Sequence, residues 1–388
     1  MSAAQLIAPN GAPLTHKYHS GEIVRAAFSP DHLHWIEERR ALVSSRRTIP
    51  VTCTYYSPIL FESVAARIIK ESVWGSQIDQ EDGVFVWWDG NGPQVAIPDY
   101  EWARTLAATE AVRSHNDQVG FSAGCVAMMM IQNDPDIAKL LCTHQNIPKN
   151  ALNQFLSRNQ AVLHDVGKFS GLTFPYLVGG VESNIQTRKL MHIIIGASLV
   201  DYCTGVEDIE MLTLAEVDHF VMQLGHHWFL EQYPNRDYLP TFRNYQDIVP
   251  LVYAAFDLLT GVQEGTKLVD ILEEVLCGRD PVFIKVFLGA IKAQITSLVD
   301  SYIAMLESKR EYMMRTGTEF TPEEALHRVS SLAVERGIPK IVIKSLSDFS
   351  ETNRTRHGTP LHYGIERFVA EIIGPHAGRI ERAVGANL

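Results

Sequence analysis

The chain of 388 residues has few cysteines and none of the cysteine spacings that bind zinc. Its five cysteines are odd in number, scattered, and never arranged as C-x-x-C. This pattern argues against a disulfide framework and favours reduced thiols. Glycine-rich phosphate loops of the G-x-x-x-x-G-K-[ST] or G-x-G-x-x-G type are also absent, so neither P-loop nor Rossmann nucleotide binding is expected.

Positive charge is scarce as well. Lys and Arg number 34 against 45 Asp and Glu, which gives a formal net charge of −11. A stable complex with nucleic acid is therefore not expected, although a local basic pocket for one phosphorylated ligand is compatible with this charge. Long apolar runs are missing too, since Ile193–Val200 and Val249–Leu259 are far shorter than a membrane span. Without a secretion signal at the start, we expect a soluble cytoplasmic protein that does not enter the membrane.

The composition is that of a globular protein, with 46% apolar and 20% charged residues. The length predicts two or three domains. A β-rich block lies near the N-terminus, where Thr48–Tyr56 is rich in β-branched and aromatic residues, and where Gly83–Trp88 and Gln94–Ile97 flank a D-G-N-G hairpin turn. Helices are predicted at residues 31–46 and 59–72. We therefore predict a small α+β domain over residues 1–105, regulatory or dimerising; homodimer formation stays open.

From Asp99 onward the apolar spacing is helical. It predicts a mainly α fold with a helical domain over residues 106–315 and a helical extension over 316–388. Thr321-Pro-Glu-Glu324 is a capping box with proline at the first helical position, which marks the start of a helix in that extension. Helices are expected at residues 99–114, 117–132, 135–143, 149–164, 183–203, 213–230, 246–260, 266–277 and 281–315.

The most informative stretch is Ala161–Phe169, which reads A-V-L-H-D-V-G-K-F. His164 and Asp165, adjacent on one helical turn, can offer an imidazole nitrogen and a carboxylate to the same metal site. Lys168 follows His164 by four residues, so on a helix its ammonium group would share that face and could meet a substrate phosphate. A buried, hydrogen-bonded pair that caps a helix is the alternative interpretation of His164 and Asp165.

The H-D-x-G-K string resembles the HD superfamily of metal-dependent phosphohydrolases, and the residues further along resemble its HD-GYP branch. His192 follows His164 by 28 residues (192 − 164) and precedes a Gly-Ala-x-Leu stretch. The pair His226-His227 comes 34 residues later (226 − 192) and is similar to the double histidine of the family. Upstream, His115 begins a His-x-x-x-Val string that resembles the opening histidine motif.

This resemblance covers roughly residues 110 to 295 and implies an HD-type helical bundle that holds two divalent transition metal ions. Iron or manganese is expected first, with nickel or zinc as alternatives. Asp165 would bridge the ions and, together with Lys168, would be catalytic, with Lys168 neutralising charge on a phosphate oxygen. The resemblance assigns the remaining ligands as His115, His164 and Asp257 for one ion, and His192, His226 and His227 for the other.

The resemblance implies a metal-dependent phosphodiesterase or phosphohydrolase whose ligand is a phosphorylated small molecule, such as a cyclic dinucleotide of the cyclic di-GMP type. The final metal-binding aspartate of the family falls on Ala254, so Asp257 is the nearest acid on that predicted helix. The Arg-Pro-Tyr-Arg segment of the family is missing after Thr260. These departures leave two alternatives open: an inactive HD-GYP-like sensor or partner-binding protein, and a di-iron HD oxygenase. The surviving ligand spacings favour an enzyme.

Overall fold

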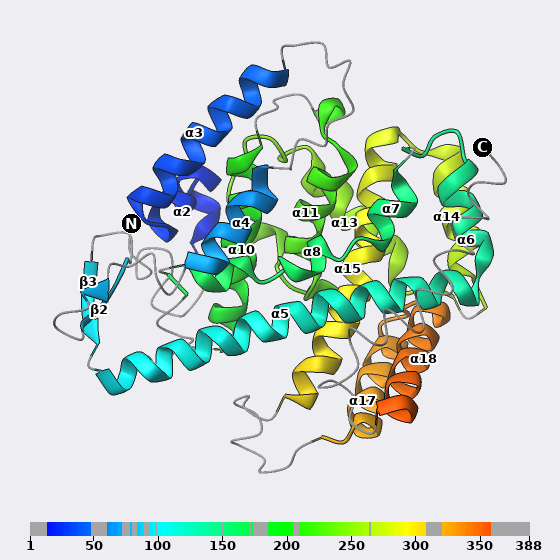
Figure 1. Ribbon diagram of the computed structural model, residues 1–388. Coiled ribbons are helices and arrows are strands. Elements are labelled where there is room, and N and C mark those ends of the chain that lie inside the picture. The colour runs from blue at the N-terminus through cyan, green and yellow to red at the C-terminus, as the bar shows by residue number, and fades with distance from the viewer. Residues whose placement is uncertain are drawn as a thin grey trace. The chain divides into compact units, whose positions relative to one another are not determined.

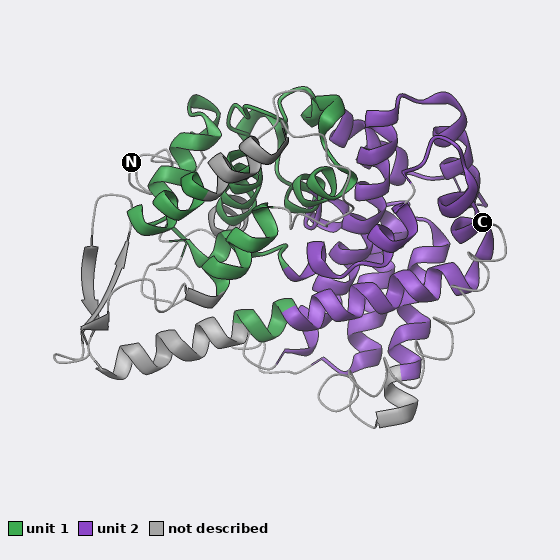
Figure 2. Cartoon of the chain, turned by 45° about the horizontal axis from the view of Figure 1, so that its top comes forward, with its two compact units in different colours: residues 1–116, 163–224, 232–250 green, residues 117–162, 225–231, 251–388 purple. Residues whose placement is uncertain are grey.

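The fold was analysed in a computed structural model of the chain (Figure 1). The described part is mainly α-helical, as the sequence predicts. The chain divides into two compact units (Figure 2): unit 1 comprises residues 1–116, 163–224 and 232–250, and unit 2 comprises residues 117–162, 225–231 and 251–388. The predicted three-domain division at residues 105 and 315 remains a prediction. The structure describes residues 14–47, 60–71, 78–79, 84–88, 93–97, 99–148, 150–170, 172–173, 185–204, 209–263, 265–307 and 320–357.

Unit 1 begins with an element that the sequence did not indicate. A short 3₁₀ turn, η1 (Thr15–Lys17), leads into helix α2 (Ser20–Ala27), whose Ile23 and Val24 side chains are fully buried. Helix α2 packs against α10 (Ile185–Cys203), and the Ser20 hydroxyl donates a hydrogen bond to the Asp201 carboxylate on α10. An eight-residue helix is marginal by itself in water, so its stability comes from this packing.

The predicted helices at residues 31–46 and 59–72 are confirmed as α3 (Pro30–Arg47) and α4 (Leu60–Glu71). Three short strands follow: β1 (Ile78–Asp79), β2 (Val84–Trp88) and β3 (Pro93–Ile97). They pair antiparallel in the order β1-β2-β3, which agrees with the hairpin predicted around the D-G-N-G turn. The strand predicted at Thr48–Tyr56 lies outside the described residues, so the α+β domain over residues 1–105 stays a prediction.

Helix α10 packs against η2 (Val166–Phe169) and α4 as well as α2, and its Ile193, Ile194 and Ile195 side chains are fully buried. Gly196 permits close approach here, because an added Cβ would lie 1.9 Å from the side-chain oxygen of Gln223. The amide of Gln223 donates a 2.9 Å hydrogen bond to the Leu163 carbonyl oxygen, which fixes the turn that follows. The remaining elements of unit 1 are η3 (Ile209–Met211), α11 (Leu214–Gly225) and η4 (Arg236–Tyr238).

Unit 2 is built around α15 (Pro281–Leu306), which is buried along most of its length. The other helices of this unit are α6 (Pro135–Thr143), α7 (Ala151–Leu156), α8 (Asn159–Val162), α12 (Trp228–Glu231), α13 (Ile248–Leu259), α14 (Leu268–Gly278), α17 (Pro322–Glu335) and α18 (Lys340–His357). Helix α5 (Asp99–Asn133) runs from unit 1 into unit 2. Contacts with α7, α12, α14, α17 and α18 cover α15.

Helix α15 is long and apolar enough to cross a membrane by length and composition, but 94% of its apolar window is buried inside the protein. A core helix passes the same test, and two polar anchors fit that role. The Lys292 ammonium group donates hydrogen bonds to the carbonyl oxygen of Gln154, at 2.7 Å, and to Gln160 Oε1, at 2.6 Å. Asp300, near the other end of α15, is 5% exposed.

Several of the predicted helices have other boundaries in the structure. Residues 99–114 and 117–132 form one helix, α5, since His115 and Asn116 are buried within it. The predicted helix 149–164 is broken into α7 and α8, and 213–230 into α11 and α12. The capping box at Thr321 is confirmed: its hydroxyl accepts a 3.2 Å hydrogen bond from the Glu324 N–H.

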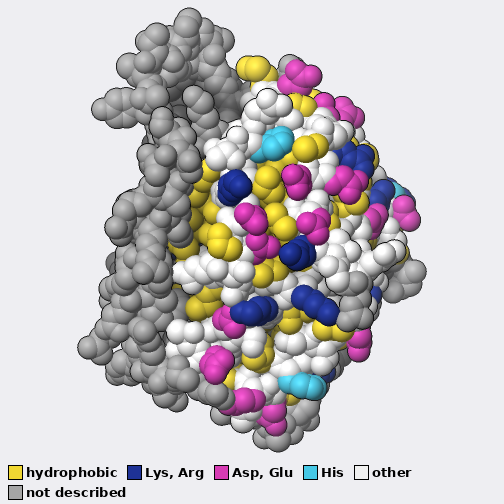
Figure 3. Space-filling view, turned by 90° about the vertical axis from the view of Figure 1, so that its right-hand side faces the viewer, with side chains coloured by type: hydrophobic (Ala, Val, Ile, Leu, Met, Phe, Trp, Pro, Cys, Tyr) yellow, Lys and Arg dark blue, Asp and Glu magenta, His cyan; other side chains and the backbone are white. Residues whose placement is uncertain are grey.

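Figure 3 shows one face of the molecule, on which cationic and anionic side chains are interspersed with scattered apolar ones. Mixed signs of this kind are typical of a solvated surface. This face has no large patch of side chains of one charge sign among the described residues.

Candidate metal centre

The His-Asp pair lies in a turn, which corrects the prediction of a helical placement. Helix α8 ends at Val162, residues 163–165 form the turn, and the 3₁₀ helix η2 begins at Val166. The N–H of Lys168 donates a 2.9 Å hydrogen bond to the carbonyl oxygen of Asp165. The turn brings Lys168 to Asp165, three residues away, instead of aligning it with His164 on one helical face.

Asp165 is the centre of a buried cluster within unit 1. Its side chain and that of His164 are 0% exposed. His164 Nε2 lies 3.3 Å from Asp165 Oδ2, and His192 Nε2 lies 3.1 Å from Asp165 Oδ1. The Lys168 ammonium group also contacts Oδ2, and the Lys168 side chain is 20% exposed. One buried carboxylate therefore has two imidazoles and a cation around it, and only the cation reaches solvent.

The electrostatics of this cluster favour the carboxylate form of Asp165. Burial acts to raise its pKa, but the charges of His164 and Lys168, with hydrogen bonds from His164 and His192, lower it, and the resulting pKa lies well below the usual value. An ionised carboxylate buried away from water is costly unless it is paired or bound to a metal. The cluster thus presents a charged oxygen ligand beside two nitrogen ligands.

Gly167 explains why the sequence allows this close arrangement. A Cβ at this position would lie 1.9 Å from the carbonyl oxygen of His192 and 2.9 Å from its Cα. Only glycine lets η2 approach the backbone of α10 so closely, and this approach sets the distance between Asp165 and His192. The glycine of the H-D-x-G-K string is therefore a packing residue that positions two candidate ligands.

Two groups of largely buried side chains offer ligand atoms of the kinds that bind a metal ion. The first consists of Asp165, His192, His226 and His227, and the second of His115, His164 and Asp300. The ring centroids of His115 and His164 are 5.8 Å apart, and those of His226 and His227 are 4.4 Å apart. The His227 Nδ1 atom lies 3.5 Å from Glu231 Oε2. Each group could hold a metal ion, and together they contain all the histidines that the sequence singled out.

The carboxylate of the second group is one that sequence reasoning missed. Asp300 on α15 is 5% exposed, and it is the carboxylate of the group that could hold a metal ion with His115 and His164. Asp257, expected to hold this place, is exposed on α13, as is Ala254. One signal could have identified Asp300: a lone acid within the apolar helix that ends at Leu306 must be buried, and buried carboxylates are rare unless paired or bound to metal.

The nucleophile-elbow pattern G-x-S-x-G is present as Gly120-Phe-Ser-Ala-Gly124, but it lies in the middle of α5. A nucleophile elbow requires a sharp strand-to-helix turn, which a continuous helix does not contain. The small residue at 120 has a packing role instead, since a Cβ there would lie 2.1 Å from the side chain of Val162.

The comparisons with known proteins do not assign the chain to a family. No family model matches it, and neither a curated protein nor a solved structure is similar to it. The fold and the buried His/Asp groups are therefore the observations from which function must be inferred.

The donor set fits transition metals. Five imidazoles and two carboxylates make up the two groups. Imidazole-rich sites suit iron, manganese, nickel or zinc, whereas calcium and magnesium prefer oxygen donors. The oxygen ligands here are few and the nitrogen ligands many, so the residues present are compatible with two transition metal ions.

Proposed function

We propose that the chain is a metal-dependent phosphohydrolase or phosphodiesterase that uses two transition metal ions at its buried His/Asp groups. The observation that carries this proposal is the Asp165 carboxylate, which is fully buried and contacts His164, His192 and Lys168. The H-D-x-G-K string supports it as well, because its four specified residues meet in one place: His164 and Asp165 in the buried cluster, Gly167 against the backbone of α10, and Lys168 as the partly exposed cation.

Bound metal ions would lower the pKa of a water ligand and stabilise charge on a phosphoryl group. His115, His164 and Asp300 would hold one ion, and His192, His226 and His227 the other. Asp165 has one oxygen toward His164 and the other toward His192, which is the orientation needed to bridge the two groups.

Lys168 would orient the substrate. Its side chain is 20% exposed whereas Asp165 is 0% exposed, so its ammonium group connects the buried carboxylate with solvent. A phosphate group that approaches from solvent meets this cation first, and the electrostatic attraction holds the phosphate next to the ligand cluster. We infer that Lys168 contacts a phosphate oxygen directly and is a catalytic residue in that sense.

The first experiment measures transition metal per chain, in the purified protein and after incubation with iron or manganese. We expect about two equivalents for the wild type and none to one for the Asp165→Ala variant. His327→Ala is the matched control, because His327 is an exposed histidine on α17, and it should bind metal like the wild type. No metal in the wild type under any of these conditions would overturn the proposal.

The second experiment measures hydrolysis by the metal-loaded protein of a phosphodiester, a phosphomonoester and a cyclic dinucleotide. Lys168→Met should lower turnover by about 100-fold or more while the metal content stays at two equivalents. Metal binding without hydrolysis of any of the three would favour the inactive sensor. Oxygen consumption that depends on iron would favour the di-iron oxygenase.

The cellular setting is part of the same proposal. The net charge and the cysteine pattern favour a cytoplasmic protein that binds a phosphorylated small molecule, not nucleic acid or membrane. Fractionation of cells that contain the tagged full chain tests the compartment, and recovery with the membrane pellet would contradict it.

A further inference from the structure

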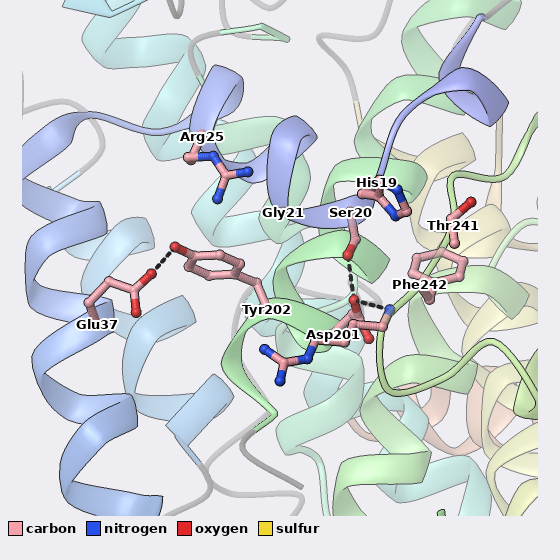
Figure 4. Close-up of a pocket in the computed structure, with 10 residues that line it drawn as sticks. His19, Ser20, Gly21, Arg25, Glu37, Asp201, Tyr202, Thr241 and Phe242 are labelled. Atoms are coloured by element: carbon pink, nitrogen blue, oxygen red, sulfur yellow. Dashed lines mark hydrogen bonds between the residues drawn. The ribbon is translucent and has the colours of Figure 1, made fainter. Parts of the chain in front are cut away.

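A pocket of about 420 Å³ in unit 1 lies outside the metal groups (Figure 4). Four segments line it: the start of α2 with the preceding His19, Glu37 of α3, the end of α10, and the loop after η4. Its volume is within the range of about 300–1,000 Å³ that is usual for small-molecule sites. It is therefore large enough for an organic ligand.

The walls of this pocket are held in place by buried hydrogen bonds. Asp201, 1% exposed, accepts the Ser20 hydroxyl and the backbone N–H groups of Arg243 and Asn244, the last two at 2.9 and 2.7 Å. The N–H of Ser20 donates a 2.9 Å hydrogen bond to the carbonyl oxygen of Thr241. One buried carboxylate on α10 thus ties α2 and the 241–244 loop together, so the pocket is formed before a ligand arrives.

Two arginines supply the positive charge of the pocket, which is also lined by the carboxylates of Glu37 and Asp201. Arg25 comes from α2 and Arg243 from the loop, and both are exposed side chains that line it. Because Asp201 is already bonded to both walls, its charge is largely engaged within the protein. The guanidinium group of arginine can donate two parallel hydrogen bonds to the oxygens of a phosphate or carboxylate group. Two guanidinium groups on separate segments favour phosphate, because a phosphate group has enough oxygens to accept hydrogen bonds from both.

The other lining groups suit the organic part of a ligand. The Tyr202 hydroxyl donates a hydrogen bond to Glu37 on α3, and Figure 4 shows Arg25 beside the same hydroxyl. Burial, together with the Glu37 contact, raises the pKa of Tyr202 to about 12, so the hydroxyl stays protonated at neutral pH. Tyr202 and Phe242 offer aromatic surface, and the Glu37 carboxylate can accept from ligand hydroxyl groups.

We propose that this pocket, the arginine pocket, binds a small phosphate monoester that carries hydroxyl groups, with its phosphate held by Arg25 and Arg243. The site is separate in sequence from the candidate metal ligands but shares helix α10 with one of them. Asp201 follows His192 by nine residues (201 − 192), which is about 13 Å along a helix. A ligand in the arginine pocket therefore binds a helix that also carries a candidate metal ligand.

The test measures binding by titration calorimetry, with a nucleoside 5′-monophosphate, a pentose 5-phosphate, inorganic phosphate and acetate as probes. The protein is the full chain as purified. We expect at least one monoester to bind, and Arg25→Met and Arg243→Met each to raise its Kd by about tenfold or more, the usual effect of losing a charge-assisted hydrogen bond. The two monoesters distinguish a nucleotide from a sugar phosphate.

Arg158→Met is the matched control, because Arg158 is an exposed arginine of unit 2 that does not line the pocket. It should leave the Kd unchanged. Equal binding by wild type, both pocket variants and the control would show that the phosphate binds elsewhere, for example at the metal groups, and would overturn the proposal. Lack of binding by both monoesters at millimolar concentration, or equally tight binding of acetate or inorganic phosphate, would also overturn it.

This test is independent of the proposed phosphohydrolase activity. A chain that binds no metal can still bind a monoester at the arginine pocket, and an active phosphohydrolase can lack this ligand. As a folding check, the far-UV circular dichroism and the unfolding midpoint of Arg25→Met should match those of the wild type, because Arg25 is exposed.

Discussion

Two histidine–carboxylate contacts inside unit 1 differ in what surrounds the carboxylate. His219 on α11 is fully buried, and its Nε2 atom lies 2.8 Å from Oε1 of Glu62, whose side chain is 25% exposed. The ring of Phe61 packs against the same imidazole, with centroids 4.8 Å apart. Asp165, by contrast, is fully buried and contacts His164, His192 and Lys168. Water can still reach Glu62, whereas the charge of Asp165 must be balanced by the groups around it.

By this difference, His219 is a structural histidine of the core, whereas His164 and His192 are candidate ligands. One hydrogen bond to a partly exposed carboxylate accommodates one nitrogen of the buried His219 imidazole. Several imidazoles gathered near one buried carboxylate exceed what packing requires. Among the described residues, His219 and Glu62 belong to no group of three or more potential metal ligands. Three substitutions break or sharpen the comparison.

The largest effect is expected at Asp300. Asp300→Asn removes the negative charge from the group with His115 and His164, and should weaken binding of one metal ion by at least about 100-fold, more than the loss of an outer-shell partner. Metal titration measures this. Asp257→Asn is the matched control, because Asp257 is exposed on α13. The reverse result, with metal lost only in Asp257→Asn, would show that Asp257 is the metal ligand, as the sequence predicted.

A smaller effect is expected from Gly167→Ala, which forces a Cβ to within 1.9 Å of the His192 carbonyl oxygen. Because backbone must shift, the free energy of unfolding should fall by about 1–3 kcal/mol, and metal content should fall as His192 moves from Asp165. Denaturant titration and metal analysis measure both. Gly124→Ala is the control: the nearest atom would be 3.8 Å away, so stability should stay the same or rise by about 1 kcal/mol. Equal behaviour of the two variants would refute the positioning role of Gly167.

The smallest effect is expected at the core histidine. Glu62→Gln replaces a charged acceptor with a neutral one beside His219, and should lower the free energy of unfolding by about 1 kcal/mol. Metal content should not change. A loss of metal in Glu62→Gln would show that the His219 contact is coupled to the metal groups, and the distinction between the two contacts would fail.

Much of the helical framework could be predicted because its signals are local. The helix at 135–143 is found as α6 with the same bounds, and the helices predicted at 183–203, 246–260 and 266–277 agree with α10, α13 and α14 to within two residues at each end. Apolar spacing and capping residues determine such elements. Helix α2 was missed because its eight residues span only about two helical turns, although Glu22 caps its first turn.

The sequence could predict only those residues of the candidate site that belong to a recognisable motif or spacing. His164, Asp165 and Lys168 lie together in sequence, and the other histidines follow at recognisable spacings. Asp300 follows His164 by 136 residues (300 − 164), and no local pattern relates the two. A resemblance that ends near residue 295 placed the last acid on α13, whereas the structure places the buried acid on α15.

The burial of α15 has a consequence for the order in which the chain is made. Helices α17 and α18 cover part of α15, but they are synthesised after it, since they span residues 322–357. Until they emerge from the ribosome, the part of α15 that they cover is exposed, in a segment whose hydropathy suits a membrane span. Such a segment is a natural target for chaperones that bind unfolded chains and a hazard for aggregation. Unit 2 can therefore bury α15 fully only after α17 and α18 have been synthesised.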